Sequence, residues 1–104
     1  MNADEIIGMI NRGDAVNLKG VKVVGDLDLT NLGNRHQERK NKDSFFSKVE
    51  VELTFVNCTF TDDFLAFYCE DYSDRCYRAD FGKAVTFIDC TFKGETSFKY
   101  SLFP

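Results

Sequence analysis

The sequence predicts an all-β solenoid, that is, a chain wound into a coil of short extended legs. Two observations lead to this fold class. The side chains of Phe87, Phe92, Phe98 and Phe103 follow one another at intervals of five, six and five residues. Units of a small, a polar and a large residue recur with the same rhythm earlier in the chain. The 104 residues, of which 43% are hydrophobic, allow one domain with a modest core.

The interval of five residues fits neither a continuous strand nor a helix. Side chains alternate between the two faces of a strand, so Phe87 and Phe92 would point in opposite directions. In a helix the same two residues would lie about 140° apart. A chain that turns a corner after each short leg brings every large residue inward, and repetition of such legs winds a coil.

The earlier units follow the same pattern, which supports a repeat architecture. Four legs of five or six residues make a coil of about 22 residues, so Phe81 is expected to stack on Phe103. The inward-facing pairs before residue 82 are Val16/Leu18, Val21/Val23, Leu27/Leu29, Leu53/Phe55, Cys58/Phe60 and Ala79/Phe81.

The units "CTF" (58–60 and 90–92), "ADF" (79–81) and "VTF" (85–87) resemble the pentapeptide-repeat family, whose consensus is Ala-Asp/Asn-Leu followed by two variable residues. The alternating spacing is similar to a Phe-rich branch of that family. This resemblance implies a right-handed, four-sided parallel β-helix, here of about three to four coils, and a bacterial source. The expected core comprises Leu18, Val23, Leu29, Phe55, Cys58, Phe60, Phe81, Phe87, Cys90, Phe92, Phe98 and Phe103.

The opening residues predict a short helix over residues 3–12. Asn2 can cap it, Glu5 can complete a capping box, and Gly13 can end it. The isoleucines within it form one apolar face. Because an open coil exposes apolar surface and unpaired backbone, we expect this helix to cover one end of the solenoid.

Two segments interrupt the rhythm. Residues 33–48 are polar, with five Lys and Arg against two acids, and are expected to form an inserted basic loop. This loop is either simply solvated or a contact arm for an acidic partner. Residues 61–78 combine aromatic and acidic side chains in an irregular coil, which is either the edge of the core or a contact surface. The candidate partner contacts are Arg35, His36, Arg39, Lys40 and Lys42.

The four cysteines are expected to be structural. Cys58 and Cys90 occupy equivalent places in the repeat and are expected to be small core residues. Cys69 and Cys76 leave a disulfide or half a metal site open, although no histidine lies near them in the sequence. Reduced thiols would suit the cytoplasm, which we expect because the start of the chain lacks a secretion signal and no apolar run is long enough to span a membrane.

The sequence does not favour catalysis, and no metal or other cofactor is expected. No Ser or Cys can be paired with a base, because His36, the single histidine, lies in the basic loop. Paired carboxylates such as Asp26/Asp28 alternate with core positions and are expected to face water, where they would make poor general acids.

The leading functional hypothesis is a non-catalytic scaffold or protein-binding module with an unknown protein partner. The net charge of -4 also allows the alternative, implied by the resemblance, of an acidic mimic of DNA that acts on DNA gyrase or another DNA-binding protein. Direct binding to nucleic acid is disfavoured, because the acidic body repels a polyanion. Phe103 completes a leg and only Pro104 follows it, so we expect either an end-to-end homodimer or a chain cut from a longer protein.

Overall fold

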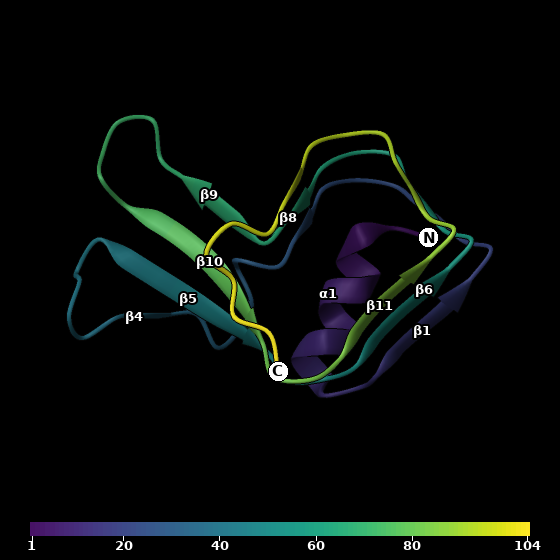
Figure 1. Ribbon diagram of the computed structural model, residues 1–104, viewed down its shortest axis with the longest axis horizontal. Helices are drawn as coiled ribbons and strands as arrows, with labels where there is room; N and C mark the ends of the chain where they lie inside the picture. Colours follow the sequence, from purple (N-terminus) through teal and green to yellow (C-terminus); the bar gives the residue numbers. More distant parts are fainter.

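The computed structural model describes residues 1–104 and contains one helix followed by short strands (Figure 1). The elements are α1 (Ala3–Arg12), β1 (Val16–Lys19), β2 (Lys22–Val23), β3 (Leu27–Asp28), β4 (His36–Gln37), β5 (Ser44–Val49), β6 (Leu53–Val56), β7 (Thr59–Phe60), β8 (Phe64–Leu65), β9 (Phe67–Cys69), β10 (Cys76–Phe81), β11 (Val85–Ile88), β12 (Thr91–Phe92) and β13 (Thr96–Ser97).

Nine of these strands form three parallel, three-stranded sheets, ordered β1-β6-β11, β2-β7-β12 and β3-β8-β13. The chain crosses each sheet once per coil, so β1–β3, β6–β8 and β11–β13 belong to three successive coils. In the first sheet Leu18 pairs with Phe55, which pairs with Phe87. In the second, Val23 pairs with Phe60, which pairs with Phe92. These stacked parallel layers are compatible with a β-helix solenoid.

The spacing between stacked residues locates both interruptions at one corner of the coil. Phe81 and Phe103, whose rings stack, are separated by one uninterrupted coil. Phe55 and Phe87 are also stacked equivalents one coil apart, but more residues lie between them than in the uninterrupted coil. Still more residues lie between Leu18 and Phe55, the equivalent pair one coil earlier. The extra residues follow the third sheet crossing in both coils. The two additions therefore emerge from the coil side by side.

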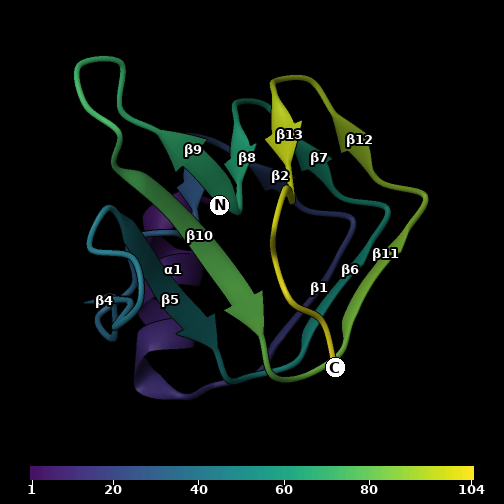
Figure 2. The same ribbon diagram turned by 60° about the vertical axis from the view of Figure 1, so that its left-hand side comes forward.

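The two additions form a mixed four-stranded sheet, ordered β4-β5-β10-β9, which we call the wing (residues 36–49 and 67–81). Strands β5 and β10 run parallel, and each has an antiparallel partner, β4 or β9. Figure 2 shows these strands standing apart from β11, β12 and β13. The segment 33–48 is therefore a β-hairpin rather than a loop. Its strands form because a second hairpin beside it supplies the backbone partners that an isolated hairpin lacks.

The segment 61–78 is less irregular than expected. Residues 61–66 continue the coil, and Phe64 in β8 is fully buried. Only the residues after Ala66 leave the coil, to form β9, a tip and the start of β10. In most other units the first inward-facing residue of a leg is small and the second is large. In this leg the order is reversed, because Phe64 comes first and Ala66 second.

Aromatic rings fill the interior of the coil. Phe55 stacks on Phe87 with ring centroids 5.5 Å apart, and Phe60 stacks on Phe92 at 4.9 Å. Phe64 meets both columns edge-on, which is a favoured geometry for aromatic pairs. Among the expected core residues, the buried ones are Val23, Leu29, Phe55, Cys58, Phe60 and Phe81, while Leu18, Phe87, Cys90, Phe92 and Phe98 are half-buried and Phe103 is exposed.

Helix α1 covers the first coil. Its residues Ala3, Ile6 and Ile10 are buried. The Asn2 side chain accepts a hydrogen bond from the Asp4 N–H (2.9 Å), and Gly13 ends the helix in the left-handed region. No hydrogen bond joins the Glu5 side chain to the Asn2 N–H, so the expected capping box is not formed; on either side of Asn2, the Met1 carbonyl and the Ala3 N–H bond the backbone of Val24. The segment before the helix thus also pairs with the free edge of the first coil.

Candidate interaction surface

The predicted contact residues divide into two groups in and next to the wing. Arg39, Lys40 and Lys42 are exposed at the tip of the β4–β5 hairpin. Arg35 is turned inward: its guanidinium lies 4.0 Å from the centroid of the Tyr77 ring, and its Nε donates to the Thr30 carbonyl. His36 packs on Phe46, with ring centroids 3.9 Å apart. The structure therefore leaves three of the five residues free at one tip.

Aromatic side chains stiffen one face of the wing. Phe45, Tyr77 and Tyr68 come from three adjacent strands and stack in a row, at centroid distances of 5.2 and 4.9 Å. Cross-strand aromatic pairs of this kind stabilise a sheet. The Arg35 guanidinium also packs on the ring of Tyr77, the middle member of this row. These residues hold the hairpins together and are not available as a separate patch.

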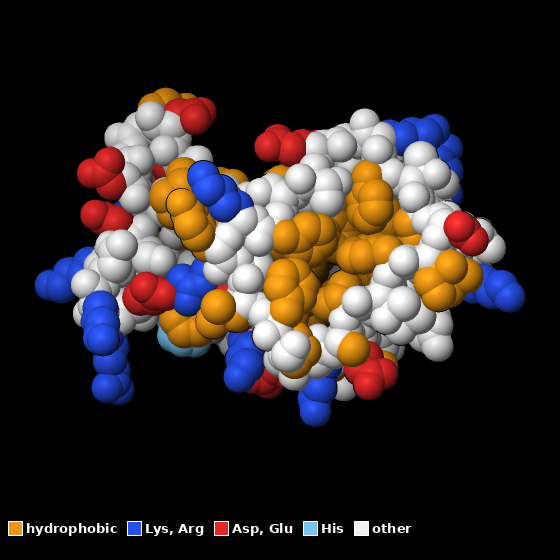
Figure 3. Space-filling model, viewed as in Figure 1, with side chains coloured by type: hydrophobic (Ala, Val, Ile, Leu, Met, Phe, Trp, Pro, Cys, Tyr) orange, Lys and Arg blue, Asp and Glu red, His pale blue; other side chains and the backbone are white.

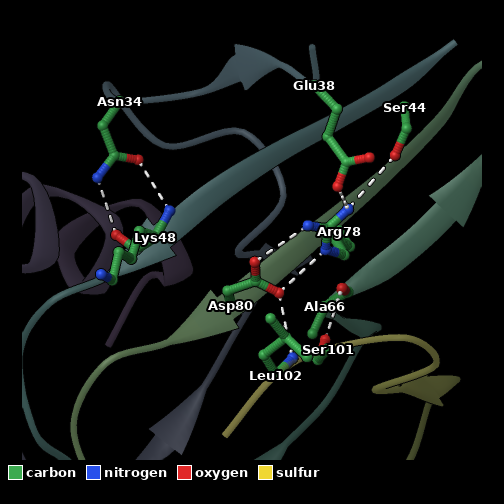
Figure 4. A network of polar contacts seen from close by, with 9 residues as sticks. All are labelled: Asn34, Glu38, Ser44, Lys48, Ala66, Arg78, Asp80, Ser101 and Leu102. Carbon is green, nitrogen blue, oxygen red and sulfur yellow. Dashed lines mark hydrogen bonds and ion pairs between the residues drawn. The ribbon is translucent and has the colours of Figure 1, made fainter. Parts of the chain in front are cut away.

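An ionic network joins both hairpins to the third coil (Figure 4). Arg78 on β10 forms ion pairs with Glu38, beside β4, and with Asp80 at 3.0 Å. Asp80 also accepts the N–H of Leu102 at 3.1 Å, and Ser101 donates to the Ala66 carbonyl at 3.2 Å. Desolvation lowers the pKa of Arg78, but the hydrogen bonds to Asp80 and Glu38 outweigh it and raise that pKa. The network holds the wing in a fixed position against the coil.

A hydrogen-bond pair anchors the base of the β4–β5 hairpin. The Asn34 side-chain amide donates to the Lys48 carbonyl at 2.9 Å and accepts the Lys48 N–H at 3.0 Å (Figure 4). Beside it, the buried Ser47 hydroxyl donates to the Thr30 carbonyl and accepts the Leu32 N–H. The hairpin therefore leaves the coil through a fully bonded base.

The tip of the β9–β10 hairpin is closed covalently. Cys69 and Cys76 form a disulfide between directly opposed strand positions. Within the tip, Glu70 accepts hydrogen bonds from the hydroxyls of Tyr77 and Ser73. The Tyr77 bond, then the Ser73 bond, lowers the pKa of Glu70, and the same Tyr77 bond raises the pKa of Tyr77. The disulfide alternative that the sequence left open is the one present.

The two tips differ in charge and lie at the same end of the wing. The Cys76 N–H donates to the Asp43 carbonyl at 2.8 Å, so the tips are neighbours. One presents Arg39, Lys40 and Lys42, and the other presents Asp71 and Asp74, all exposed. Tyr72 crowns the acidic tip and is 97% exposed.

A cleft of about 440 Å³ separates the wing from the third coil. Phe67, Arg78 and the disulfide line its wing side, and Lys99 and Tyr100 line its coil side. The Lys99 ammonium lies 5.1 Å from the Tyr100 ring centroid, and Tyr100 adopts a left-handed backbone with φ 60°. Figure 3 shows basic and apolar side chains meeting at this side of the wing.

Carboxylates from two of the predicted pairs bond backbone N–H groups of the neighbouring coil. Asp26 accepts the N–H of Asp63 at 3.0 Å, and Asp63 accepts the N–H of Glu95 at 2.8 Å. These residues occupy the same corner in successive coils and form a carboxylate ladder. Next to it, hydrogen bonds from the Thr61 hydroxyl and the Gly25 N–H lower the pKa of Asp62.

The remaining chemical groups lie apart from one another. The thiols of Cys58 and Cys90 are free and lie within hydrogen-bond distance of backbone carbonyls of the preceding coil. The structure contains no group of three or more metal-ligating side chains. Helix α1 is too short for a transmembrane helix.

The pairing of the two inserted hairpins through β5 and β10 was not predicted from the sequence. Arg78 and Asp80, which anchor the wing, carry no motif that identifies them. One signal was present: both additions interrupt their coil at the same place in the repeat, which predicts that they are neighbours. Comparisons with protein-family models, with curated proteins and with solved structures found no match to this chain.

Proposed function

We propose that the chain is a non-catalytic scaffold that presents the wing to a protein partner. In this proposal the coil is a right-handed, four-sided β-helix of the pentapeptide-repeat kind from a bacterium. The Cys69–Cys76 disulfide argues against the cytoplasm that the sequence led us to expect, because disulfides persist in oxidising compartments. The main observation behind this proposal is that ion pairs of Arg78 with Glu38 and Asp80 fix the wing against the coil. The two charged tips of the wing remain exposed. A rigid base with exposed tips suits recognition, because little order has to be gained on binding.

The composition of the wing end also fits a contact surface. Tyr72 offers an almost fully exposed aromatic ring, and Tyr and Arg are enriched in protein interfaces. The opposite charges on the two tips favour a partner that carries an acidic patch and a basic patch at a matching distance. Such charge complementarity raises the association rate and fixes the orientation of the partner.

The placement of the reactive groups supports a non-catalytic role. His36 packs on Phe46, and its Nδ1 lies 2.8 Å from the Asn34 carbonyl oxygen. The carboxylates of Asp26 and Asp63 hold backbone N–H groups of the next coil. Each group therefore has a structural bond that explains its position.

A role as a DNA mimic is supported less well. Mimicry needs rows of free carboxylates, whereas the ladder uses Asp26 and Asp63 to join coils. The basic tip of the β4–β5 hairpin also interrupts the acidic surface. No observation favours this alternative over protein binding.

Affinity capture from bacterial lysate with tip variants tests the proposal. We expect Lys40→Glu/Lys42→Glu and Asp71→Lys/Asp74→Lys each to lose a partner that the unaltered protein retains. Lys19→Glu/Lys22→Glu, which reverses two exposed charges on the first coil, is the matched control and should keep that partner. Equal retention by all four proteins would show that the tips are not the contact.

A further inference from the structure

Strand β4 forms one open edge of the wing (Figure 1). The sheet order β4-β5-β10-β9 gives it a single neighbour, β5, with which it pairs antiparallel. The Glu38 N–H, directly after β4, donates to the Ser44 carbonyl at 2.8 Å. Because the backbone groups of successive strand residues point to opposite sides, the N–H and C=O of Gln37 face away from β5. Such unpaired edge groups are a template for another strand.

A groove of about 500 Å³ lies beside this edge. The residues that line it are His36, Gln37, Glu38, Arg39, Lys40 and Phe46. The His36 ring packs on the half-buried Phe46 ring, with centroids 3.9 Å apart, so part of the lining is apolar. A strand added at β4 can therefore bond the Gln37 backbone and also place an apolar side chain on these rings.

The exposed charges at the tip of the β4–β5 hairpin favour an acidic occupant. Arg39, Lys40 and Lys42 outnumber the one exposed acid of this tip, Asp43. None of the three cations takes part in an ion pair. An acidic segment beside β4 is therefore attracted to the tip, whereas a basic segment is repelled.

The edge has a fixed shape before anything binds to it. The Gln37 side chain donates to the Lys42 carbonyl at 2.6 Å, across the hairpin loop. Glu38, the only acid that lines the groove, forms an ion pair with Arg78 of β10. This ion pair ties the end of β4 to the rest of the sheet and compensates the charge that would repel an acidic segment. A preordered edge loses little conformational freedom on binding.

We propose that an extended acidic segment of the partner protein adds to the wing as a further strand along β4. The segment bonds the N–H and C=O of Gln37, places an apolar residue on Phe46 and directs its carboxylates to the basic tip. Strand β9, at the other edge of the sheet, leads into the acidic tip and is unsuited to the same segment. The strand addition rests on the proposed function, because it specifies how the partner meets one of the two tips.

A synthetic peptide of alternating glutamate and valine, blocked at both ends, is the probe. Titration into the isotopically labelled full chain should shift the Gln37 amide resonance and slow its hydrogen exchange, because that N–H becomes bonded. Added salt should weaken the binding. The same peptide with methylated amide nitrogens keeps its charge but cannot pair as a strand, so it should bind about tenfold more weakly.

Two substitutions at Gln37 separate the backbone bond from the side chain. Gln37→Pro removes the outward N–H, and proline is tolerated on an edge strand where the N–H faces solvent. Gln37→Ala removes the same side chain but keeps the N–H, so it should bind the probe about tenfold more tightly than Gln37→Pro. Lys40→Glu/Lys42→Glu should bind about tenfold more weakly than the unaltered protein. Circular dichroism should show the same β content in all these proteins.

Equal binding of the methylated peptide would assign the attraction to charge alone and overturn the strand addition. An unchanged Gln37 amide in the unaltered protein would overturn it without any variant. Capture from lysate separates the two proposals. If Gln37→Pro retains a partner that the tip variants lose, the wing binds its partner without β4, and only the strand addition fails. If no partner is captured but the peptide bonds Gln37, the edge site stands and the role of both tips fails.

Discussion

At the residue scale, one corner of the coil depends on a backbone conformation that few residues tolerate. Gly20, Asn57 and Asp89 occupy this corner in the three coils, with φ angles of 66°, 52° and 52°. Glycine, asparagine and aspartate are the residues that adopt the left-handed region most readily. The residues before "CTF" in the two Cys-containing units are therefore turn residues, which explains how a five-residue step restores the inward direction.

Replacing Asn57 by valine should destabilise the protein, because a β-branched side chain is strained at this φ angle. We expect a loss of about 1–2 kcal/mol in the free energy of unfolding, measured by urea denaturation. Asn57→Gly should be close to neutral. Asn17→Val changes an exposed residue in β1 and is the matched control. Equal losses for the two valine variants would show that the left-handed corner is not the cause.

Gly94 is required for a different reason, namely space. A Cβ atom at this position would lie 2.5 Å from both the carbonyl carbon and the oxygen of Asp62. Backbone atoms cannot yield as a side chain can, so Gly94→Ala should cost about 1–3 kcal/mol in unfolding free energy. Gly20→Ala, where no atom lies within 4 Å, should cost less despite its positive φ. The reverse order in urea denaturation would contradict this assignment.

At the scale of elements, some features of the molecule could be predicted from the sequence, whereas the pairing of strands within the wing could not. The apolar rhythm predicted the coil legs and the helix over residues 3–12. It could not predict that β5 and β10 pair, because the bonds depend on the register between two segments that lie far apart in the sequence. The packing of the Arg35 guanidinium on the Tyr77 ring could not be predicted for the same reason. The basic residues that local sequence did identify are those at the hairpin tip.

The Cys69–Cys76 disulfide should stabilise the acidic tip by limiting its freedom when the hairpin opens. Replacing both cysteines by serine should lower the unfolding free energy by about 2–3 kcal/mol on the chain-entropy account. Adding a thiol reductant should have a similar effect on the unaltered protein and none on the double variant. A reductant effect in both proteins would assign the change to another site. Alkylation before reduction should label only Cys58 and Cys90, and only after unfolding for the buried Cys58.

The Glu70 carboxylate should make the tip sensitive to acid. Hydrogen bonds from Tyr77 and Ser73 lower its pKa below the usual 4.5. A carboxylate with a lowered pKa in the folded state contributes stability above the unfolded pKa, and that stability is lost as the pH falls through the folded value. The protection factors of the tip amides, that is, their exchange relative to the intrinsic rate at each pH, should therefore fall as the pH drops below 4.5. Tyr77→Phe should reduce this dependence, and an unchanged profile in that variant would rule out the Tyr77 bond as its cause.

At the scale of the whole molecule, the wing is an insertion into an uninterrupted coil. If residues 33–47 and 67–76 are set aside, the large positions follow steps of five and six throughout. The sequence therefore contained the full coil, and the place of the two additions in the repeat also implied that they are neighbours. Their mutual bonds could not be predicted, because Glu38, Arg78 and Asp80 meet only after both hairpins have formed.

This organisation predicts that the two insertions depend on each other more than the coil depends on either. Removing residues 33–47 leaves β10 without β5, exposes Tyr77 and takes Glu38 from Arg78. Removing residues 67–76 deletes β9 and the first residue of β10, so that only residues 77–81 of the second hairpin remain beside β5. Removing both restores a regular coil with no unpaired hairpin. The double deletion should therefore cost less than the sum of the single deletions, with a coupling energy of about 1–3 kcal/mol.

Urea unfolding of the four proteins gives the coupling directly, provided that circular dichroism shows a β-rich fold in each. As a control, Asn57→Val combined with the deletion of residues 33–47 should be additive, because that corner lies away from the wing. If the two deletions add without coupling, the hairpins are independent excursions and the wing is not a unit. If the double deletion fails to fold while both single deletions fold, the coil requires the wing, and the insertion account is wrong.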